Sequence, residues 1–255
     1  MCIRDRAGNE GERLYETPAG LINSIGLQNP GVRHFIEHEL PAMKRLGPAA
    51  MANLGGSTIE TYEEGARLLD GTDVDLIELN ISCPNVKAGG IAYGIRAQSA
   101  REVVARVRAC TKKPLVVKLS PNAENITEMA LACEEAGADG LSLVNTFQAM
   151  AIDLASRRPV FQNIFAGLSG PAIRPIALRM VYQVCRAAVS YTHLDVYKRQ
   201  RWTSAATKRC AISSFPERIT PFWAAARCAC ALKTRRCSSP SFALRCARRC
   251  TAICG

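Results

Sequence analysis

The stretch Asp75-Leu-Ile-Glu-Leu-Asn80 decides the fold, because it is a short, mostly apolar run between two amphipathic segments. The segment before it, residues 58–70, and the one after it, residues 99–110, both have helical periodicity. A bounded apolar run of this length is typical of a buried strand, and longer amphipathic segments are typical of surface helices. The sequence therefore predicts a strand with a helix on either side of it.

The same alternation continues along the chain. Further strands are expected over residues 49–53, 114–118 and 140–145, and further helices over about 124–136 and 171–188. Repeated strand and helix units require a parallel sheet, which is either an open doubly wound sheet or a (β/α)8 barrel. Periodicity alone leaves both architectures open.

Four successive apolar runs end on polar residues, namely Asn53, Asn80, Lys118 and Asn145. Each has an ordinary explanation, since asparagine suits turns and a strand-end lysine can extend into solvent or form an ion pair. Four in register are harder to explain in this way. Carboxyl ends of parallel strands meet at one edge of the sheet, so three amides and an ammonium group would face a planar, polar ligand with donors and acceptors.

Charge, cysteine and glycine divide the chain into a body and two unusual ends. Residues 7–190 hold 18 Lys+Arg and 19 Asp+Glu, whereas residues 201–255 hold 11 basic residues and one acidic residue. Seven of the 12 cysteines lie in that tail, and 17 of the 18 glycines precede residue 190. Folded segments need turns, and glycine is common in them. Most of the net charge of +11 therefore comes from residues 201–255, a tail with a net charge of +10 that we do not expect to fold.

The codon table suggests an origin for both ends. A single DNA string, GATGTGTATAAGAGACAG, encodes residues 195–200 in one frame and residues 1–5 in another, and its reverse complement encodes residues 189–193. The string resembles a transposon-end sequencing adapter. We interpret residues 1–6 and 189–200 as adapter-derived, residues 7–188 as a partial barrel, and residues 201–255 as an out-of-frame tail.

The alternative is a genuine basic, cysteine-rich extension that binds nucleic acid or zinc. Zinc sites favour Cys-x2-4-Cys pairs with a matching second pair, whereas here Cys228-x-Cys230 stands beside Cys246-x3-Cys250-x3-Cys254 with no nearby histidine. The aromatic residues of the tail are also irregularly spaced. We therefore expect no metal site and no nucleic-acid partner. A tail that binds DNA would predict salt-sensitive DNA retention that is lost with residues 201–255.

The most specific motif is Leu79-Asn-Ile-Ser-Cys-Pro-Asn-Val-Lys-Ala-Gly-Gly90. Most lone cysteines are inert core residues, but Cys83 follows a strand end and lies between asparagines. A second motif is Thr17-Pro-Ala-Gly-Leu-Ile-Asn-Ser-Ile-Gly-Leu-Gln-Asn-Pro-Gly31, which by composition alone would be a turn-rich connector. Together these motifs resemble class 1 dihydroorotate dehydrogenases, and the resemblance covers residues 7–188.

The resemblance implies a (β/α)8 barrel that binds FMN and oxidises (S)-dihydroorotate to orotate in pyrimidine biosynthesis. It implies that Cys83 is the base that removes the C5 proton. The implied substrate-binding residues are Asn23, Ser24, Ile25, Gly26, Leu27, Asn80, Asn85, Asn145 and Thr146. The implied FMN-binding residues are Asn53, Asn80, Lys118, Val144 and Gly170.

Residues 145–159 resemble the NAD-linked subtype, which pairs a dimeric catalytic subunit with a partner that carries FAD and an iron–sulfur cluster. The family's first strands would precede residue 7, and its last two strands, with the FMN phosphate site, would follow residue 188. About four of eight barrel strands would remain. We therefore expect the chain as written neither to fold stably nor to retain FMN.

The nearest rival is a dihydropyrimidine dehydrogenase-like enzyme, which shares the Asn-x-Ser-Cys-Pro-Asn signature but reduces uracil or thymine. A third possibility is a barrel fragment that binds FMN without turnover. No apolar stretch reaches the roughly 18 residues of a membrane span, and four scattered thiols in residues 7–190 suit a reducing compartment. We therefore expect a soluble, cytoplasmic protein.

Overall fold

The computed structural model describes residues 5–82, 93–188, 191–194 and 203–204. Its main feature is a parallel sheet of consecutive strands. These are β3 (Met51–Leu54), β4 (Leu76–Asn80), β5 (Leu115–Lys118) and β6 (Gly140–Leu143). The intervening helices are α3 (Ile59–Asp70), α4 (Ala97–Arg108) and α5 (Ile126–Glu135), and α6 (Arg174–Ala187) follows later. Each lies within a few residues of the element predicted from the sequence.

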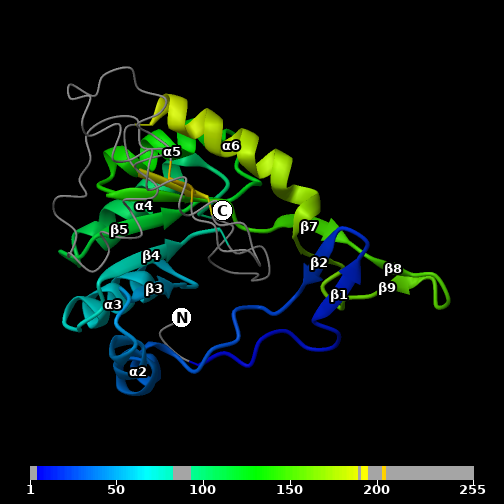
Figure 1. Cartoon of the computed structure of the whole chain (residues 1–255), viewed down its shortest axis with the longest axis horizontal. Coiled ribbons are helices and arrows are strands. Elements are labelled where there is room, and N and C mark those ends of the chain that lie inside the picture. Colours follow the sequence, from blue (N-terminus) through cyan, green and yellow to red (C-terminus); the bar gives the residue numbers. More distant parts are fainter. Residues whose placement is uncertain (1–4, 83–92, 189–190, 195–202, 205–255) are drawn as a thin grey trace, which may run out of the picture.

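Strand order distinguishes between the two architectures that the sequence left open. The sheet runs β3-β4-β5-β6-β11, so each new strand is added on the same side of the preceding one. An open doubly wound sheet would reverse this order at a switch point, whereas a βα barrel does not. Helices α3 to α6 lie beside these strands in Figure 1, and successive helices contact one another. The fold is therefore part of a (β/α)8 barrel, as predicted.

The two faces of the parallel sheet differ in chemistry. Alternate residues such as Ile77, Leu79 and Val117 are fully buried in one cluster with helix residues that include Val103 and Met129. The residues between them, which point to the other face, include Glu78, Asn80, Lys118 and Ser142. Side chains alternate across a strand, so one face builds the hydrophobic core and the other is polar.

Helix α3 illustrates how local sequence positions these elements. The side chain of Thr58 accepts a hydrogen bond from the backbone N–H of Thr61 and forms a capping box with it, which satisfies donors at the helix start. The buried residues Tyr62, Ala66 and Leu69 recur at helical spacing on the face turned to the sheet. A Cβ on Gly65 would lie 2.5 Å from Leu54 Cδ1, so glycine permits the close approach of α3 to β3.

Part of the parallel sheet comes from the range that we interpret as adapter-derived. Tyr191–Leu194, within that range, forms β11, which is parallel to β6. Thr203–Ser204, within the tail that was not expected to fold, forms the short strand β12, which is antiparallel to β11. Strand β11 takes the place of the next barrel strand after α6. Residues 1–4, 83–92, 189–190, 195–202 and 205–255 lie outside the described structure, so the proposed division of the chain at residue 188 remains a prediction.

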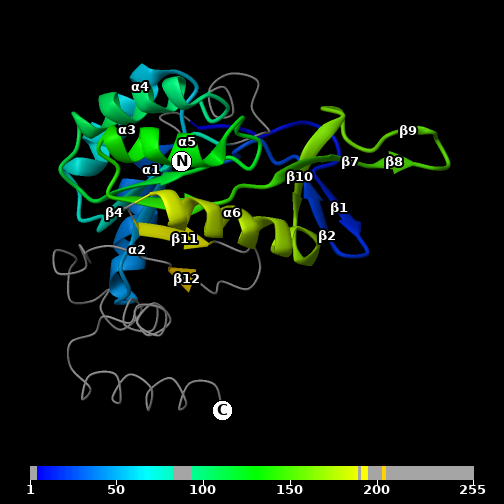
Figure 2. The ribbon, with the colours of Figure 1, turned by 90° about the horizontal axis from the view of Figure 1, so that it is seen from above.

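A second, antiparallel sheet was not predicted from the sequence. Its strands are β1 (Leu14–Thr17), β2 (Gly20–Asn23), β10 (Phe165–Ser169) and β7 (Phe147–Met150), in that spatial order. A short hairpin of β8 (Ile152–Asp153) and β9 (Arg158–Pro159) follows β7. This sheet lies at the far end of the molecule from α3, and Figure 2 shows the hairpin extending beyond it. The sheet joins residues 14–23 to residues 147–169.

The remaining helical segments precede β3 or lead into α6. They are α1 (Val32–His34), the π-helical turn η1 (Phe35–Glu39), α2 (Leu40–Arg45) and the 3-10 turn η3 (Pro171–Ile173). Of the described helices, none combines the length and the hydropathy that crossing a bilayer would require.

Candidate active site

Polar residues gather at the carboxyl ends of the parallel strands, on the face away from the helices. In the strand register Asn53 pairs with Glu78, Asn80 pairs with Lys118, and Lys118 pairs with Ser142. All five side chains belong to the same alternating set, so they face the barrel interior. The strand ends that the sequence predicted to be polar therefore bring their side chains together on one face of the sheet.

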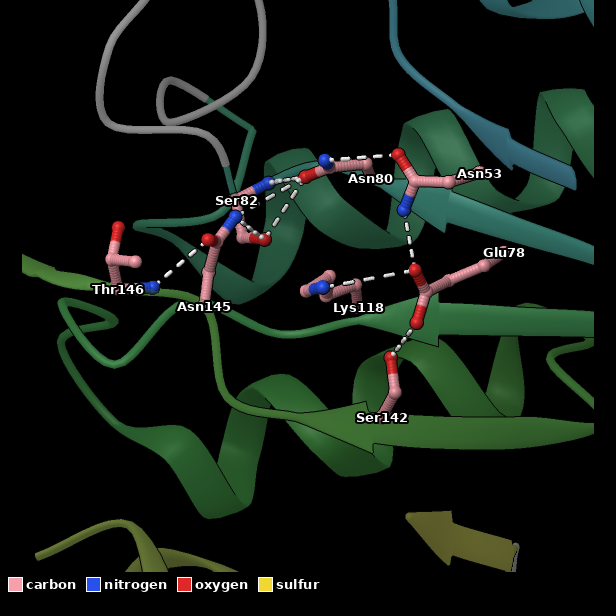
Figure 3. A network of polar contacts seen from close by, with 8 residues as sticks. All are labelled: Asn53, Glu78, Asn80, Ser82, Lys118, Ser142, Asn145 and Thr146. Carbon is pink, nitrogen blue, oxygen red and sulfur yellow. Dashed lines mark hydrogen bonds and ion pairs between the residues drawn. The ribbon is translucent and has the colours of Figure 1, made fainter. Parts of the chain in front are cut away.

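Glu78 is the centre of an inner-face network, which we define as Asn53, Glu78, Lys118 and Ser142 (Figure 3). Its carboxylate is buried, and it accepts hydrogen bonds from Ser142 Oγ at 2.7 Å and from Asn53 Nδ2. Lys118 Nζ lies 3.8 Å from Glu78 Oε2. Lys118 thus forms an ion pair, which is the ordinary explanation given above for a lysine at a strand end. It also lies at the carboxyl edge of the sheet, where the sequence predicted a ligand.

Sequence reasoning missed Glu78 and Ser142, although a signal for both exists. Glu78 is the one charge inside the apolar run that precedes Asn80, and it is two residues from Asn80. Ser142 interrupts the apolar run of β6 in the same way. In a strand with one face on the core, a polar residue at that spacing must point to the opposite face. Counting two positions back from Asn80 would have identified Glu78, and Ser142 stands out as the polar residue of β6.

A second set of contacts, the amide chain, continues from Asn53 toward β7. Asn80 Nδ2 donates to Asn53 Oδ1 at 3.3 Å, and Asn80 Oδ1 accepts from the N–H and the hydroxyl of Ser82. Asn145 Nδ2 donates to Ser82 Oγ at 2.9 Å, and Asn145 Oδ1 accepts from Thr146 N at 2.8 Å. Predicted ligand-binding residues from the ends of three strands, β3, β4 and β6, are thereby brought into one hydrogen-bonded series, with Ser82 as a link that was not predicted.

The predicted loop from Asn23 to Leu27 leaves the end of β2. Asn23 Nδ2 donates to the carbonyl of Gly167 at 3.2 Å. Ser24 is buried, and its hydroxyl oxygen lies 3.3 Å from the side-chain amides of both Asn9 and Asn163. Ile25 is exposed, and Gly26 and Leu27 both have positive φ. The loop is therefore held at Asn23 and Ser24, and its tip turns sharply.

Strand β10 connects this loop to the amide chain. Gly167 pairs with Asn23 on one side and with Gln148 on the other, and an added Cβ would lie 2.1 Å from Thr146 Oγ1. Asn23 and Thr146 therefore contact the same glycine from opposite sides. Of the predicted FMN-binding residues not yet placed, Val144 is buried directly after β6, and Gly170 follows β10 with φ of 106°.

Tyr62 supports the carboxyl end of β4 from the core side. Its side chain is fully buried, and its hydroxyl donates to the carbonyl of Asn80 at 2.8 Å. Its ring also lies edge-on to Tyr93, with centroids 6.0 Å apart. Tyr62 therefore fixes the backbone at the carboxyl end of β4, where Asn80 lies.

Substitution Tyr62→Phe should lower the free energy of unfolding by about 1 kcal/mol, because it removes the donor from a buried carbonyl. Denaturant unfolding monitored by circular dichroism would measure this loss. The matched control is Tyr182→Phe, since Tyr182 is 58% exposed on α6 and should tolerate the same change. Equal stability of the two variants would contradict the proposed support of Asn80.

The described cysteines do not lie at the polar edge. Cys133 and Cys185 are buried among the helices, and Cys110 follows α4 with its thiol 3.3 Å from the carbonyl of Arg106. Burial raises the pKa of Cys133 to about 12, which makes its thiol a poor base. The predicted catalytic Cys83 and the predicted substrate-binding Asn85 both lie outside the described residues.

The chemistry of the polar edge fits a planar heterocycle better than a metal. Within the described ranges, no three histidine, cysteine or acidic side chains are grouped as metal ligands. Asparagine side chains supply both donors and acceptors, and the lysine ammonium carries three donor protons and can serve Glu78 and a ligand together. An isoalloxazine ring, with carbonyl and N–H groups along one edge, needs this combination. Asn53, Asn80 and Lys118 would contact that edge.

Comparisons with known proteins agree on one family. The family model described as dihydroorotate dehydrogenase matches residues 1–191. Relatives named as the catalytic subunit of dihydroorotate dehydrogenase B (NAD(+)) include proteins of Petrotoga mobilis, at 57% identity over 187 residues, and Geotalea uraniireducens, at 54% over 188. Each alignment covers 73% of this chain and 62% of the relative. The chain therefore spans about three fifths of the length of these relatives.

Proposed function

Because the chain belongs to the dihydroorotate dehydrogenase family, we propose that it is the catalytic part of an FMN-dependent enzyme that oxidises (S)-dihydroorotate to orotate. The observation that carries this proposal is the joining of Asn53, Asn80, Lys118 and Asn145 at one edge of a partial βα barrel. These residues come from successive strand ends. That edge is where βα-barrel enzymes place their active sites.

Cys83 is the proposed base. Its thiolate takes the proton from C5 of dihydroorotate, and the electron pair of the broken C5–H bond forms the C5–C6 double bond. When bound, FMN accepts the hydride that leaves C6. A cysteine has an ordinary pKa of about 8.5, so the rate should rise as the pH approaches that value and the thiolate forms.

The amides of Asn23, Asn80, Asn85 and Asn145, together with Thr146 and the loop Ser24 to Leu27, are proposed to hold the pyrimidine and its carboxylate. Neutral amides offer donors to carboxylate and carbonyl oxygens and acceptors to ring N–H groups. Lys118 places positive charge at the cofactor edge, where a flavin gains negative charge on reduction. Asn53, Val144 and Gly170 complete the proposed contacts to FMN.

We further propose that electrons leave through a separate subunit that carries FAD and an iron–sulfur cluster and reduces NAD+. The names of the relatives support this, since they specify a catalytic subunit and NAD(+). A homodimeric catalytic core and a cytoplasmic location belong to the same proposal.

Anaerobic mixing of the FMN-loaded full-length protein with (S)-dihydroorotate should bleach the flavin absorbance near 450 nm within about a second, given typical enzyme turnover of roughly 1–10³ s⁻¹. Dihydrouracil, which lacks the carboxylate, is the matched control and should reduce the flavin far more slowly. Faster reduction by dihydrouracil would favour a dihydropyrimidine dehydrogenase-like activity. No bleaching by either compound would overturn the proposal.

A further inference from the structure

Glu78 lies where a charge is most costly unless it is compensated. It is 5% exposed, in the middle of a strand whose other residues are also buried. Desolvating a carboxylate costs several kcal/mol, so it persists only with close partners. Glu78 has three partners, from β3, β5 and β6, which fix its position from both sides of its own strand.

The Glu78 side chain extends past the neighbouring strand to the one beyond it. Strand β5 separates β4 from β6, yet Glu78 Oε1 accepts from Ser142 Oγ on β6. The Glu78 carboxylate therefore lies across the inner face of β5. Lys118 is the last residue of that strand. The other oxygen of Glu78, Oε2, is approached by both Asn53 Nδ2 and Lys118 Nζ. Two of the proposed FMN-binding residues thus converge on a single carboxylate oxygen.

This arrangement has an electrostatic consequence. Lys118 and Glu78 form a pair with no net charge, so the field that reaches a ligand at the barrel edge is that of a dipole rather than a full cation. The interior has a lower effective dielectric constant than water, so the difference between these two fields is substantial. Removing the charge of Glu78 alone would make the field of Lys118 at the ligand more positive.

We propose that Glu78 is a positioning residue that holds the Lys118 ammonium group and limits its charge at the flavin, and thereby sets how easily the bound flavin is reduced. The inference rests on the proposed function for its ligand. Glu78 itself contacts neither flavin nor substrate in this scheme. It acts through Lys118 and Asn53.

The test is Glu78→Gln in the FMN-loaded full-length protein, with anaerobic redox titration as the readout. Glutamine keeps the size of the side chain and removes its charge. With the negative charge of Glu78 removed, Lys118 should stabilise the negative charge of the reduced flavin more strongly, so the equilibrium constant for reduction should rise at least tenfold. For a two-electron couple this is a shift of about 30 mV to more positive potential.

Glu63→Gln is the matched control. Glu63 is also a buried glutamate, 8% exposed, with ion pairs to Arg67 and Arg106, but it lies on α3 away from the inner face. The control should lose stability without a change in flavin potential. An unchanged potential in Glu78→Gln, or an equal shift in Glu63→Gln, would overturn the proposal. Restoration of the original potential by Glu78→Asp would support a role for the charge.

A second measurement does not depend on flavin. In the apoprotein, Lys118→Gln should destabilise the fold more than the double variant Lys118→Gln/Glu78→Gln, because only the single variant leaves a buried carboxylate without its cation. A double variant no more stable than Lys118→Gln would contradict the pairing, and this comparison does not need the Glu78→Gln single variant. A wild-type protein that never binds FMN would refute the proposed function, and this cycle would still decide whether Glu78 holds Lys118.

Discussion

Replacement of Cys83 by serine is expected to slow flavin reduction by dihydroorotate about 10²- to 10⁴-fold, which is the usual contribution of a positioned general base. A serine hydroxyl has a far higher pKa than a thiol, so it remains protonated wherever the enzyme is stable. The residual rate should also lose the rise toward pH 8.5 that a cysteine base predicts. Anaerobic stopped-flow measurements across a pH series would test both effects.

Cys110→Ser provides the matched control for this substitution. Cys110 is partly exposed on the helix side of the sheet, so the same change there should leave the rate and its pH dependence intact. Dihydroorotate should still bind to the Cys83→Ser protein, since the amides proposed to hold it are untouched. Near-normal turnover in Cys83→Ser would mean that another group removes the C5 proton.

The parallel sheet could be predicted because its strands and helices carry strong local signals. In α3 the capping residue Thr58 and the spacing of Tyr62, Ala66 and Leu69 fix the start of the helix and its buried face before any tertiary contact forms. The strand ends at Asn53, Asn80 and Lys118 were predicted for the same reason. Their meeting at one edge follows from parallel pairing and needs no further information.

The antiparallel sheet could not be predicted in this way. Strand β2 is four residues long and begins at Gly20, and its partner β10 lies more than a hundred residues later. Short strands whose stability comes from distant pairing carry little local signal. Glu78 was missed for a different reason. Its position was visible in the sequence, but its role depends on Ser142, which is 64 residues away and two strands across.

Gly167 lies between residues from the two sheets that are both proposed to bind substrate, namely Asn23 and Thr146. Its backbone receives the amide of Asn23 on one side, and its missing side chain leaves room for Thr146 on the other. The loop from the antiparallel sheet and the amide chain from the parallel sheet are therefore held at a distance set by one glycine. Nothing larger than hydrogen fits between β10 and Thr146.

Substitution Gly167→Ala should therefore disturb both stability and substrate binding. The new methyl group would lie 2.1 Å from Thr146 Oγ1 and 2.7 Å from its Cβ, so β10 or Thr146 must move. Overpacking of this kind costs about 1–3 kcal/mol in free energy of unfolding. Displacement of Thr146 should raise the KM for dihydroorotate about tenfold, which corresponds to roughly 1.4 kcal/mol of lost binding.

Gly71→Ala is the control for this prediction, because an added Cβ there meets nothing closer than 3.9 Å. It should leave both the KM and the stability essentially unchanged. The double variant Gly167→Ala/Thr146→Ala should be less destabilised than the sum of its parts, since it removes the hydroxyl that the new methyl strikes. If Gly167→Ala raised the KM while leaving the stability untouched, the contact with Thr146 would not be the cause, and a direct contact of Gly167 with the ligand would have to replace it.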